Sequence, residues 1–362
     1  MKVLVVFNHI APYKVAIFNE LAKLCDLTVI FERKKEKSRP DSYYNFNNLN
    51  FNHIILKSGE FGDAGSISSE VKRYIKKHHQ EFDRIVMNGY SHLAEMKALN
   101  YMIKNHIPYD LLINGGIAKE KECWIKRRLK KKYIGHANRY LSPSKKANEY
   151  LEFYGADSSR ISVYPYANIQ NDDFATLPVD KKALRKKYDL PIDKRIFINP
   201  SMFIERKNNI ALIKEFKGRE DILLLVGQGK EEDSYHKFIK ENNMNSVIIM
   251  PFKDRKTVFE LYRLGDAFIT LSKEDIYGHT TLEALASAIP VISSDKVVSS
   301  LSLIKNGING YIIDNQDSEA IQKAIDSITK IKPEACLESV KNFTYKNAAK
   351  AIYQILKGEE DE

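Results

Sequence analysis

Short apolar runs alternate with amphipathic stretches along the first half of the chain. The run VLVVF at 3–7 is followed by apolar residues at helical spacing, which predict a helix near 13–24. Similar runs predict further strands at 27–31, 84–88, 109–114 and 139–144, with helical segments between them. Strands that alternate with helices in this way indicate a parallel sheet that is covered on both faces.

The same alternation returns in the second half. Apolar runs predict strands at 195–200, 221–227, 246–250, 267–271 and 290–294. Proline, asparagine and aspartate residues cluster at 165–180 and mark a boundary. We therefore predict an α/β protein with two Rossmann-like domains, 1–168 and 169–344, whose parallel sheets face a central cleft. In such sheets, ligands bind at the carboxyl ends of the strands.

Composition favours a soluble protein that stays in the cytoplasm. Hydrophobic residues make up 43% of the 362 residues and charged residues 29%, and no apolar run approaches the ~20 residues of a membrane-spanning helix. The opening apolar run is too short for a signal peptide. Cys25, Cys123 and Cys336 are far apart and form no C-x-x-C pair, which argues against a disulfide framework and against a thiolate zinc site.

The net charge of +10 is concentrated in the first half of the chain. Residues 119–146 are the densest part, with 11 basic and 2 acidic residues. Such a patch suits a membrane surface, a nucleic acid or a phosphorylated acceptor, but it is also typical of a solvated helix face. The apolar residues interspersed at roughly helical spacing are Trp124, Ile125, Leu129, Tyr133 and Ile134. A helix of this kind can rest on an anionic membrane leaflet.

The segment 272–292 carries the strongest chemical signal. Asp275 and Glu283 are separated by seven residues, and a helix is predicted to start near Thr280. The N–H groups and the dipole of a helix start favour a phosphate, and Gly278 allows close backbone approach. We expect Glu283, in the first helical turn, to bind a ribose diol, and Asp275 to reach the hydroxyls of a sugar.

This segment resembles the E-x7-E signature of retaining GT-B glycosyltransferases, the large family that includes capsule, lipopolysaccharide and exopolysaccharide enzymes. Asp275 stands where the family has its first Glu. Further landmarks follow in register: a strand and glycine turn at 225–229, Pro251 with Phe252, an Asn-Gly pair before an apolar run at 309–313, and the start of a closing helix at 342–347. The resemblance covers roughly 140–357 well and 1–140 more loosely. It implies that the closing helix, about 345–358, packs back on the first domain.

The resemblance also implies an activity. The chain is expected to move a hexose-type sugar from a nucleotide-diphosphate sugar, most often a UDP-sugar, to a hydroxyl of a glycan or of a polyprenyl-diphosphate-linked glycan. Configuration would be retained, and neither a cofactor nor a metal would be needed. No D-x-D triad is present, and no His, Cys or carboxylate cluster has the spacing of metal ligands in the sequence. Activity in excess chelator is therefore expected.

The donor site implied by the resemblance lies in the second half. Lys207 occupies the place of a phosphate-binding lysine, whereas Met202 replaces the expected arginine and Arg206 is a possible substitute. Lys207, Asp275 and Glu283 are the predicted catalytic residues. The predicted donor contacts are Ser201, Arg206, Lys207, Gly227, Phe252, Asp275, Tyr277, Gly278, His279, Thr280, Thr281 and Glu283.

Acceptor contacts are expected where strands of the first half end. The candidates are His9, Pro12, Tyr13, His92, Asn114 and Gly115. Many relatives have a histidine near the position of Asn114 and Gly115, and this chain has none there. His9 and His92 are possible replacements as proton acceptors, or loop histidines bonded to backbone.

Three other interpretations remain open. A non-catalytic glycosyltransferase-like subunit or chaperone would explain the substitutions at Met202, Asp275 and Gly115. A sugar-nucleotide epimerase would need acid and base groups clustered in the cleft, which the sequence does not reveal. A nucleic-acid binder would explain the basic half but not the Asp275–Glu283 pair, and no aromatic-plus-basic single-strand motif is present, so no nucleic-acid partner is predicted. We expect a cytoplasmic protein that is peripheral at the inner face of the plasma membrane.

Overall fold

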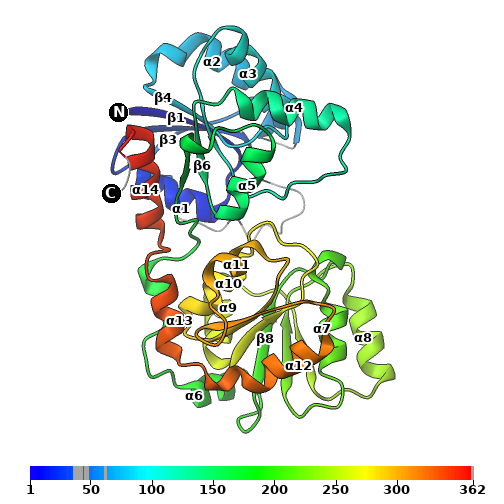
Figure 1. The fold of residues 1–362 in the computed structure, drawn as a ribbon. Coiled ribbons are helices and arrows are strands. Elements are labelled where there is room, and N and C mark those ends of the chain that lie inside the picture. The colour runs from blue at the N-terminus through cyan, green and yellow to red at the C-terminus, as the bar shows by residue number, and fades with distance from the viewer. Residues whose placement is uncertain (36–43, 45–48, 61–62, 360–362) are drawn as a thin grey trace. The chain divides into compact units, whose positions relative to one another are not determined.

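The computed structural model describes residues 1–35, 44, 49–60 and 63–359 and divides the chain into two compact units (Figure 1). The first unit comprises Met1–Ala167 and Thr344–Glu362, and the second comprises Asn168–Phe343. Each unit has one sheet, and every pairing between its strands is parallel.

The first unit is built on a seven-stranded sheet in the order β3-β2-β1-β4-β5-β6-β7. Its strands are β1 (Lys2–His9), β2 (Asp26–Arg33), β3 (Asn52–Ile55), β4 (Arg84–Met87), β5 (Asp110–Leu112), β6 (Arg139–Ser142) and β7 (Ile161–Val163). The sequence pattern predicted the inner strands and missed β3 and β7. These two form the edges of the sheet, where side chains are only half-buried or exposed, so the continuous apolar run that marks an inner parallel strand is absent.

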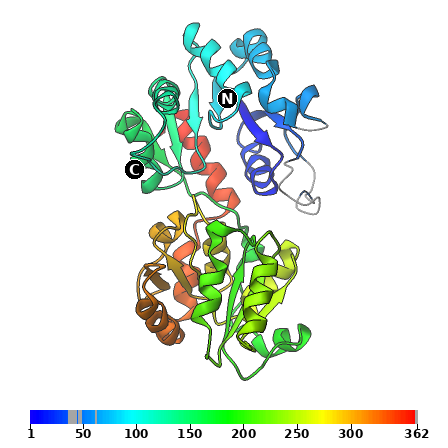
Figure 2. The same cartoon turned by 90° about the vertical axis from the view of Figure 1, so that its right-hand side faces the viewer.

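Helices cover both faces of this sheet. They are α1 (Pro12–Leu21), α2 (Glu70–His78), α3 (Leu93–Lys104), α4 (Trp124–Gly135), α5 (Lys145–Phe153) and α14 (Tyr345–Lys357). Both views show α14, in red, beside α1, in blue (Figures 1 and 2). Arg84 Nε and Arg139 Nη1 donate to the carbonyls of Leu356 and Ile355, at 2.8 and 2.5 Å. Cations at these last carbonyls stabilise the carboxyl end of α14.

The second unit has a six-stranded sheet in the order β10-β9-β8-β11-β12-β13. Its strands are β8 (Ile196–Pro200), β9 (Ile222–Val226), β10 (Val247–Met250), β11 (Ala267–Thr270), β12 (Val291–Ser294) and β13 (Gly310–Ile313). Its helices are α6 (Lys181–Lys187), α7 (Asn209–Glu215), α8 (Glu232–Glu241), α9 (Arg255–Leu264), α10 (His279–Ala286), α11 (Val298–Leu303), α12 (Ser318–Ser327) and α13 (Pro333–Val340).

The strand order reverses once in each sheet. In the first unit the reversal lies between β1 and β4, and in the second unit it lies between β8 and β11. The chain leaves the neighbouring strands in opposite directions at such a point, so the loops that follow them separate and leave room for a ligand. Most of the predicted site residues lie on the loops after these four strands or on the helices that follow those loops.

Candidate active site

An ion pair lies at the switch point of the second unit, where the strand order reverses between β8 and β11. Lys207 ends the 3₁₀ turn η7 (Glu205–Lys207), which follows β8, and Asp275 lies on the loop that follows β11. Lys207 Nζ lies 2.5 Å from Asp275 Oδ2, and both side chains are largely buried. The structure therefore brings together two of the three predicted catalytic residues, which are far apart in the sequence.

Arg206 lies beside this pair and is more exposed. Its Nη1 donates to the Glu274 carbonyl at 3.2 Å and lies 3.9 Å from Asp275 Oδ2. Burial alone would raise the pKa of the Asp275 carboxyl. The Lys207 ammonium, the Arg206 cation and a backbone hydrogen bond together outweigh burial and hold this pKa below its ordinary value. The carboxylate is thus ionised at neutral pH.

The loop that carries Asp275 is fixed from its other side by α11 and the residues before it. Val298 N–H donates to the Asp275 carbonyl at 3.1 Å, and Ser299 N–H donates to the Tyr277 carbonyl at 2.7 Å. Ser299 Oγ also donates to the Gly278 carbonyl at 2.8 Å. These bonds leave the segment 275–278 little freedom and set where α10 begins.

Gly278 occupies the N-cap position of α10 in a left-handed conformation, with φ of 84°. A Cβ atom there would lie 2.5 Å from Val297 Cγ1 and 3.6 Å from Asp275 Cγ, so the position excludes larger residues. The N–H groups of a helix start favour a phosphate, and no side chain at Gly278 caps the start of α10. The Lys207–Asp275 pair lies directly beside it.

The loops after β8 and β9 pack tightly together. A Cβ atom at Gly227 would lie 1.9 Å from the Ser201 carbonyl oxygen, and Ser201 N–H donates to the Val226 carbonyl at 3.0 Å. Phe252 follows β10 and exposes 41% of its surface. Ser201, Gly227 and Phe252 therefore lie along the carboxyl edge of the sheet, where a donor contact was predicted for each.

Glu283 lies on the predicted helix, α10, but not in its first turn. It is the fifth residue of α10 and so stands in the second turn, because the helix begins at His279. Its carboxylate accepts hydrogen bonds from Asn168 Nδ2 at 2.6 Å and Tyr262 Oη at 3.4 Å. Burial raises the pKa of Glu283, and the cation of Arg255, 3.4 Å away, acts against this rise.

Glu283 thus has its own set of partners. Among the described residues, no hydrogen bond or ion pair joins it to Lys207 or Asp275. Sequence reasoning missed these partners, Asn168, Arg255 and Tyr262, because they come from the start of the second unit and from α9. The spacing between Asp275 and Glu283 gives no information about these partners.

The predicted acceptor residues divide into two groups in the first unit. Pro12 and Tyr13 open α1, and Asn114 and Gly115 follow β5. The Tyr166 hydroxyl connects them, because it lies 3.1 Å from Tyr13 Oη and 3.0 Å from Asn114 Oδ1. His9, at the end of β1, has its ring 6.4 Å from that of Phe7.

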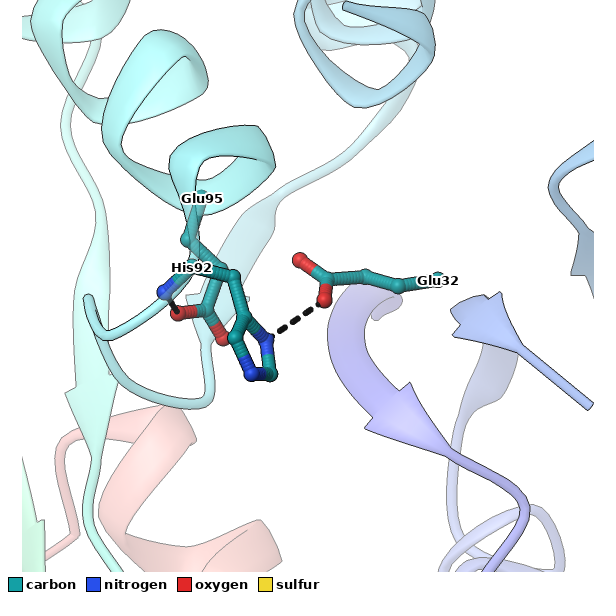
Figure 3. A group of neighbouring side chains, drawn as sticks. All are labelled: Glu32, His92 and Glu95. Atoms are coloured by element: carbon teal, nitrogen blue, oxygen red, sulfur yellow. Dashed lines mark hydrogen bonds and ion pairs between the residues drawn. The ribbon is translucent and has the colours of Figure 1, made fainter. Parts of the chain in front are cut away.

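His92 belongs to the other group, which includes two carboxylates (Figure 3). His92 Nδ1 lies 2.7 Å from Glu32 Oε2, and Glu95 Oε2 accepts a hydrogen bond from the His92 backbone N–H at 3.0 Å. The bond to Glu32 raises the pKa of His92. Burial, together with the nearby Glu32, raises the pKa of Glu95 to about 7.

This cluster corrects one statement made from the sequence. No set of metal-ligand residues has suitable spacing along the chain, yet Glu32, His92 and Glu95 have ligand atoms within 4.8 Å of one another. Sequence reasoning missed Glu32 and Glu95. Two signals were available: a charged residue directly after the apolar run LTVIF, and a His-x-x-Glu spacing typical of a helix start.

The basic segment 119–146 contains α4, and only part of its predicted apolar face is exposed. Tyr133 and Ile134 are buried in the core of the first unit, whereas Trp124 and Ile125 expose 69% and 50% of their surface. Tyr133 and Ile134, two of the five apolar residues noted in the sequence, therefore belong to the core. The last turn of the helix packs inward, and only its first turn presents apolar side chains to solvent.

A known protein family matches the part of the chain that contains the candidate site of the second unit. Residues 180–358 match the family described as glycosyl transferases group 1. This match covers just under half of the chain. This region contains the Lys207–Asp275 pair, the start of α10 and Glu283.

Curated relatives of the chain are distant in sequence. The chain is 24% identical over 194 residues to the capsular polysaccharide biosynthesis glycosyltransferase CapM of Staphylococcus aureus, covering 51% of this chain and 50% of CapM. It is 26% identical over 165 residues to the poly(glycerol-phosphate) alpha-glucosyltransferase of Bacillus subtilis, covering 43% of this chain and 24% of that protein. The chain thus aligns with half or less of the length of these relatives.

Solved structures match the whole chain. Anabaena HepE in complex with UDP superimposes with a TM-score of 0.77 at 16% identity, covering 99% of this chain and 100% of HepE. Sucrose-phosphate synthase from Thermosynechococcus elongatus gives a TM-score of 0.78 at 16% identity, covering 99% of each chain. The predicted GT-B fold, with two Rossmann-like domains, is confirmed. None of the helices in the described part of the chain has the length and apolar character that crossing a membrane requires.

Proposed function

We propose that the chain is a retaining glycosyltransferase that transfers a hexose-type sugar from a UDP-sugar to a hydroxyl of a glycan or lipid-linked glycan, in the synthesis of a surface polysaccharide. The observation that carries this proposal is the Lys207–Asp275 ion pair at the switch point of the second sheet, beside the amino terminus of α10. Its support from relatives is the group 1 match, together with the capsule enzyme CapM and the UDP complex of HepE.

The diphosphate of the donor would bind at the start of α10. The N–H groups there and the Lys207 ammonium present positive charge to the same small volume, which a diphosphate would neutralise. Lys207 is held 2.5 Å from Asp275 in the free protein. Binding would then let Lys207 move its charge to the phosphate, while Asp275 accepts hydrogen bonds from hydroxyls of the sugar.

The nucleoside would extend along the carboxyl edge of the sheet. Glu283 would accept hydrogen bonds from the ribose diol, because part of its side chain, 16%, remains exposed while Asn168 and Arg255 hold it in place. Phe252 offers an exposed ring against which the base can pack. These contacts would fix the donor before reaction.

The transfer itself needs little more than charge stabilisation. The bond between the anomeric carbon and the diphosphate oxygen breaks, and the acceptor hydroxyl forms the new bond on the same face. The leaving diphosphate takes the hydroxyl proton, so no protein nucleophile is required. Lys207 and the start of α10 would stabilise the charge that develops on the leaving group.

The acceptor would be bound by the loops of the first unit. Tyr13 and Asn114, joined through Tyr166, offer hydroxyl and amide groups suited to a glycan. The first turn of α4, with exposed Trp124 and Ile125 beside exposed Lys126 and Arg128, would rest on an anionic membrane and give access to a lipid-linked acceptor.

The test is the turnover of Lys207→Ala with UDP-sugar and acceptor. Loss of one charge-stabilising group should lower turnover ~100-fold. Lys273→Ala is the matched control, because Lys273 is an exposed lysine on the neighbouring loop, paired with Glu205 at 3.2 Å, and its loss should change turnover less than about 2-fold. Turnover of Lys207→Ala within a few-fold of the wild type would contradict the assignment.

Two further readouts separate this proposal from its alternatives. UDP affinity should be unchanged by EDTA, because the protein supplies the positive charge that a metal supplies in D-x-D transferases. A non-catalytic subunit, by contrast, would release no free nucleotide in the presence of any acceptor. Screening UDP, GDP, ADP and dTDP for thermal stabilisation identifies the donor base, since a bound ligand raises the melting temperature.

A further inference from the structure

The cluster of Glu32, His92 and Glu95 lies at the carboxyl edge of the first sheet and has no part in the proposed donor chemistry. Glu32 is at the end of β2, and His92 and Glu95 lie at the start of α3, after β4. Since β2 and β4 flank β1 in the sheet, the cluster spans the switch point of the first unit. Figure 3 shows the Glu32 carboxylate directed toward the imidazole of His92, with Glu95 behind that ring.

Burying the Glu32 and Glu95 carboxylates together costs free energy unless a cation lies beside them. Glu32 is 0% exposed and Glu95 is 2% exposed, so two carboxylates share a site away from water. Within the described residues, Glu32 Oε1 has no hydrogen-bond partner, although it is buried. An orphaned acceptor of this kind, next to a second carboxylate, indicates a position where a positive ligand would be stabilised.

No lysine or arginine in the described part of the chain forms an ion pair with either carboxylate. Arg33 is the adjacent cation, and its Nη1 lies 3.3 Å from Asp63 Oδ1. His92 is the one ion-pair partner of Glu32 found among the described residues. The cluster therefore contains two acids and one imidazole, with its nearest arginine bound to another acid.

The backbone around Glu32 is held by close packing. A Cβ atom at Gly59 would lie 1.8 Å from the Glu32 carbonyl oxygen, and one at Gly65 would lie 1.6 Å from the same atom. On the other side, the capping box of α3 fixes Glu95 against the backbone of His92. Two separate elements thus preset the positions of the carboxylates, whereas the His92 side chain keeps 25% of its surface exposed.

We propose that Glu32, His92 and Glu95 bind one divalent transition-metal ion, of the class of Mn²⁺ or Zn²⁺. One imidazole nitrogen and two carboxylate oxygens are the donor set that these ions accept, whereas Mg²⁺ and Ca²⁺ prefer oxygen alone. Metal–ligand bonds of about 2.0–2.2 Å at tetrahedral angles place two ligand atoms ~3.4 Å apart, so the ligand atoms, all within 4.8 Å of one another, need to close by up to ~1.4 Å. The exposed side of His92 leaves room for water in the remaining positions.

Titration of the chelator-treated full chain with MnCl₂, and separately with ZnSO₄, tests the site. Isothermal calorimetry should give one ion per chain, with a dissociation constant below ~100 μM, about 5.5 kcal/mol of binding free energy. Glu32→Gln keeps the shape of the side chain and should weaken binding at least ~10-fold, since even outer partners of metal ligands contribute that much. His78→Ala is the matched control, because His78 and Glu81 form an exposed histidine–carboxylate pair in the same unit, 2.7 Å apart, and it should bind as the wild type does.

Spin-echo spectra of the Mn²⁺-loaded chain provide a readout that does not depend on activity. They should show coupling to a histidine nitrogen that disappears in His92→Ala, a partly exposed position whose loss leaves both buried carboxylates in place. If Glu32→Gln fails to fold, as judged by circular dichroism, His92→Ala decides the question alone.

Binding weaker than ~1 mM, or undiminished Mn²⁺ affinity and nitrogen coupling in His92→Ala, would overturn the proposal. The cluster would then be a hydrogen-bonded proton-sharing group without a metal. Neither result bears on the UDP-sugar reaction, because the donor site lies in the other unit and its readout is turnover.

Discussion

Lys14 is a buried lysine whose charge lowers the stability of the folded protein. It lies in the first turn of α1 and is 1% exposed, with its ammonium 4.5 Å from the centre of the Tyr166 ring. Within the described residues, its Nζ atom has no hydrogen-bond partner. Burial lowers the pKa of Lys14 from 10.5 to about 7. The aromatic contact offsets only part of the cost of burying a charge.

Replacing Lys14 by methionine should therefore stabilise the protein in a pH-dependent manner. Below about pH 7 the lysine is charged in both the folded and the unfolded protein, so the full cost of burying the ammonium is present. Between pH 7 and 10.5 only the folded protein has lost the proton, so the free energy of unfolding rises with pH. Lys14→Met should exceed the wild type by ~1–4 kcal/mol in the free energy of unfolding at pH 6, the range for buried ions replaced by apolar groups. Urea unfolding should show the difference shrinking toward pH 10, and an equal difference at both pH values would refute this explanation.

Single residues also show which parts of the candidate sites could be predicted from the sequence and which could not. Lys207 and Asp275 were predicted together because the family that the sequence resembles places both residues on loops directly after strands. Glu32, by contrast, meets His92 only because β2 and β4 flank β1, and no local pattern encodes strand order. The partners of Glu283 were missed because they come from the start of the second unit and from α9, far from Glu283 in the sequence.

At the scale of elements, α10 and α11 together decide the geometry of the donor site. Ser299 and Val298 of α11 hold the loop that carries Asp275, and Gly278 starts α10 one position earlier than the sequence suggested. That shift moved Glu283 from the first helical turn to the second. Inner strands were predictable because continuous apolar runs mark them, whereas the edge strands β3 and β7 lack such runs.

Substitution of Gly278 by alanine tests whether this junction is as tightly packed as described. An alanine in the left-handed conformation costs ~1–2 kcal/mol, and its Cβ at position 278 would also overlap Val297 Cγ1. Gly278→Ala should therefore lower the free energy of unfolding by more than ~1–2 kcal/mol. It should also bind UDP at least ~10-fold more weakly. Gly218→Ala is the control, because Gly218 has φ of 78° with nothing within 4 Å of its added Cβ. Equal losses in the two variants, with UDP affinity intact in both, would show that the packing at Gly278 does not matter.

At the scale of the whole molecule, charge is divided unequally along the chain. The excess of basic residues falls in the first half, and its densest segment surrounds the exposed first turn of α4. Composition predicted this asymmetry, but only the structure separates the exposed Trp124 and Ile125 from the buried Tyr133 and Ile134. Membrane contact would thus involve one turn of α4 and not its whole length.

Trp124 offers a direct probe of membrane contact, because it is the one tryptophan of the chain. With vesicles of anionic lipid at low salt, its fluorescence should shift to the blue, and the shift should vanish at about 1 M salt, where charges are screened within ~3 Å. Reversing two charges beside it, Lys126→Glu with Arg128→Glu, should abolish binding, whereas Lys76→Glu with Lys77→Glu on α2 should not. Unchanged fluorescence with anionic vesicles at low salt would exclude this surface.

The most direct measurement of donor binding is a crystal structure of the chain with UDP or a UDP-sugar. We predict that the diphosphate lies at the amino terminus of α10, with Lys207 Nζ within hydrogen-bond distance of a phosphate oxygen and Glu283 at the ribose. A nucleotide bound elsewhere, with Lys207 still paired to Asp275 alone and the start of α10 unoccupied, would contradict the proposed function.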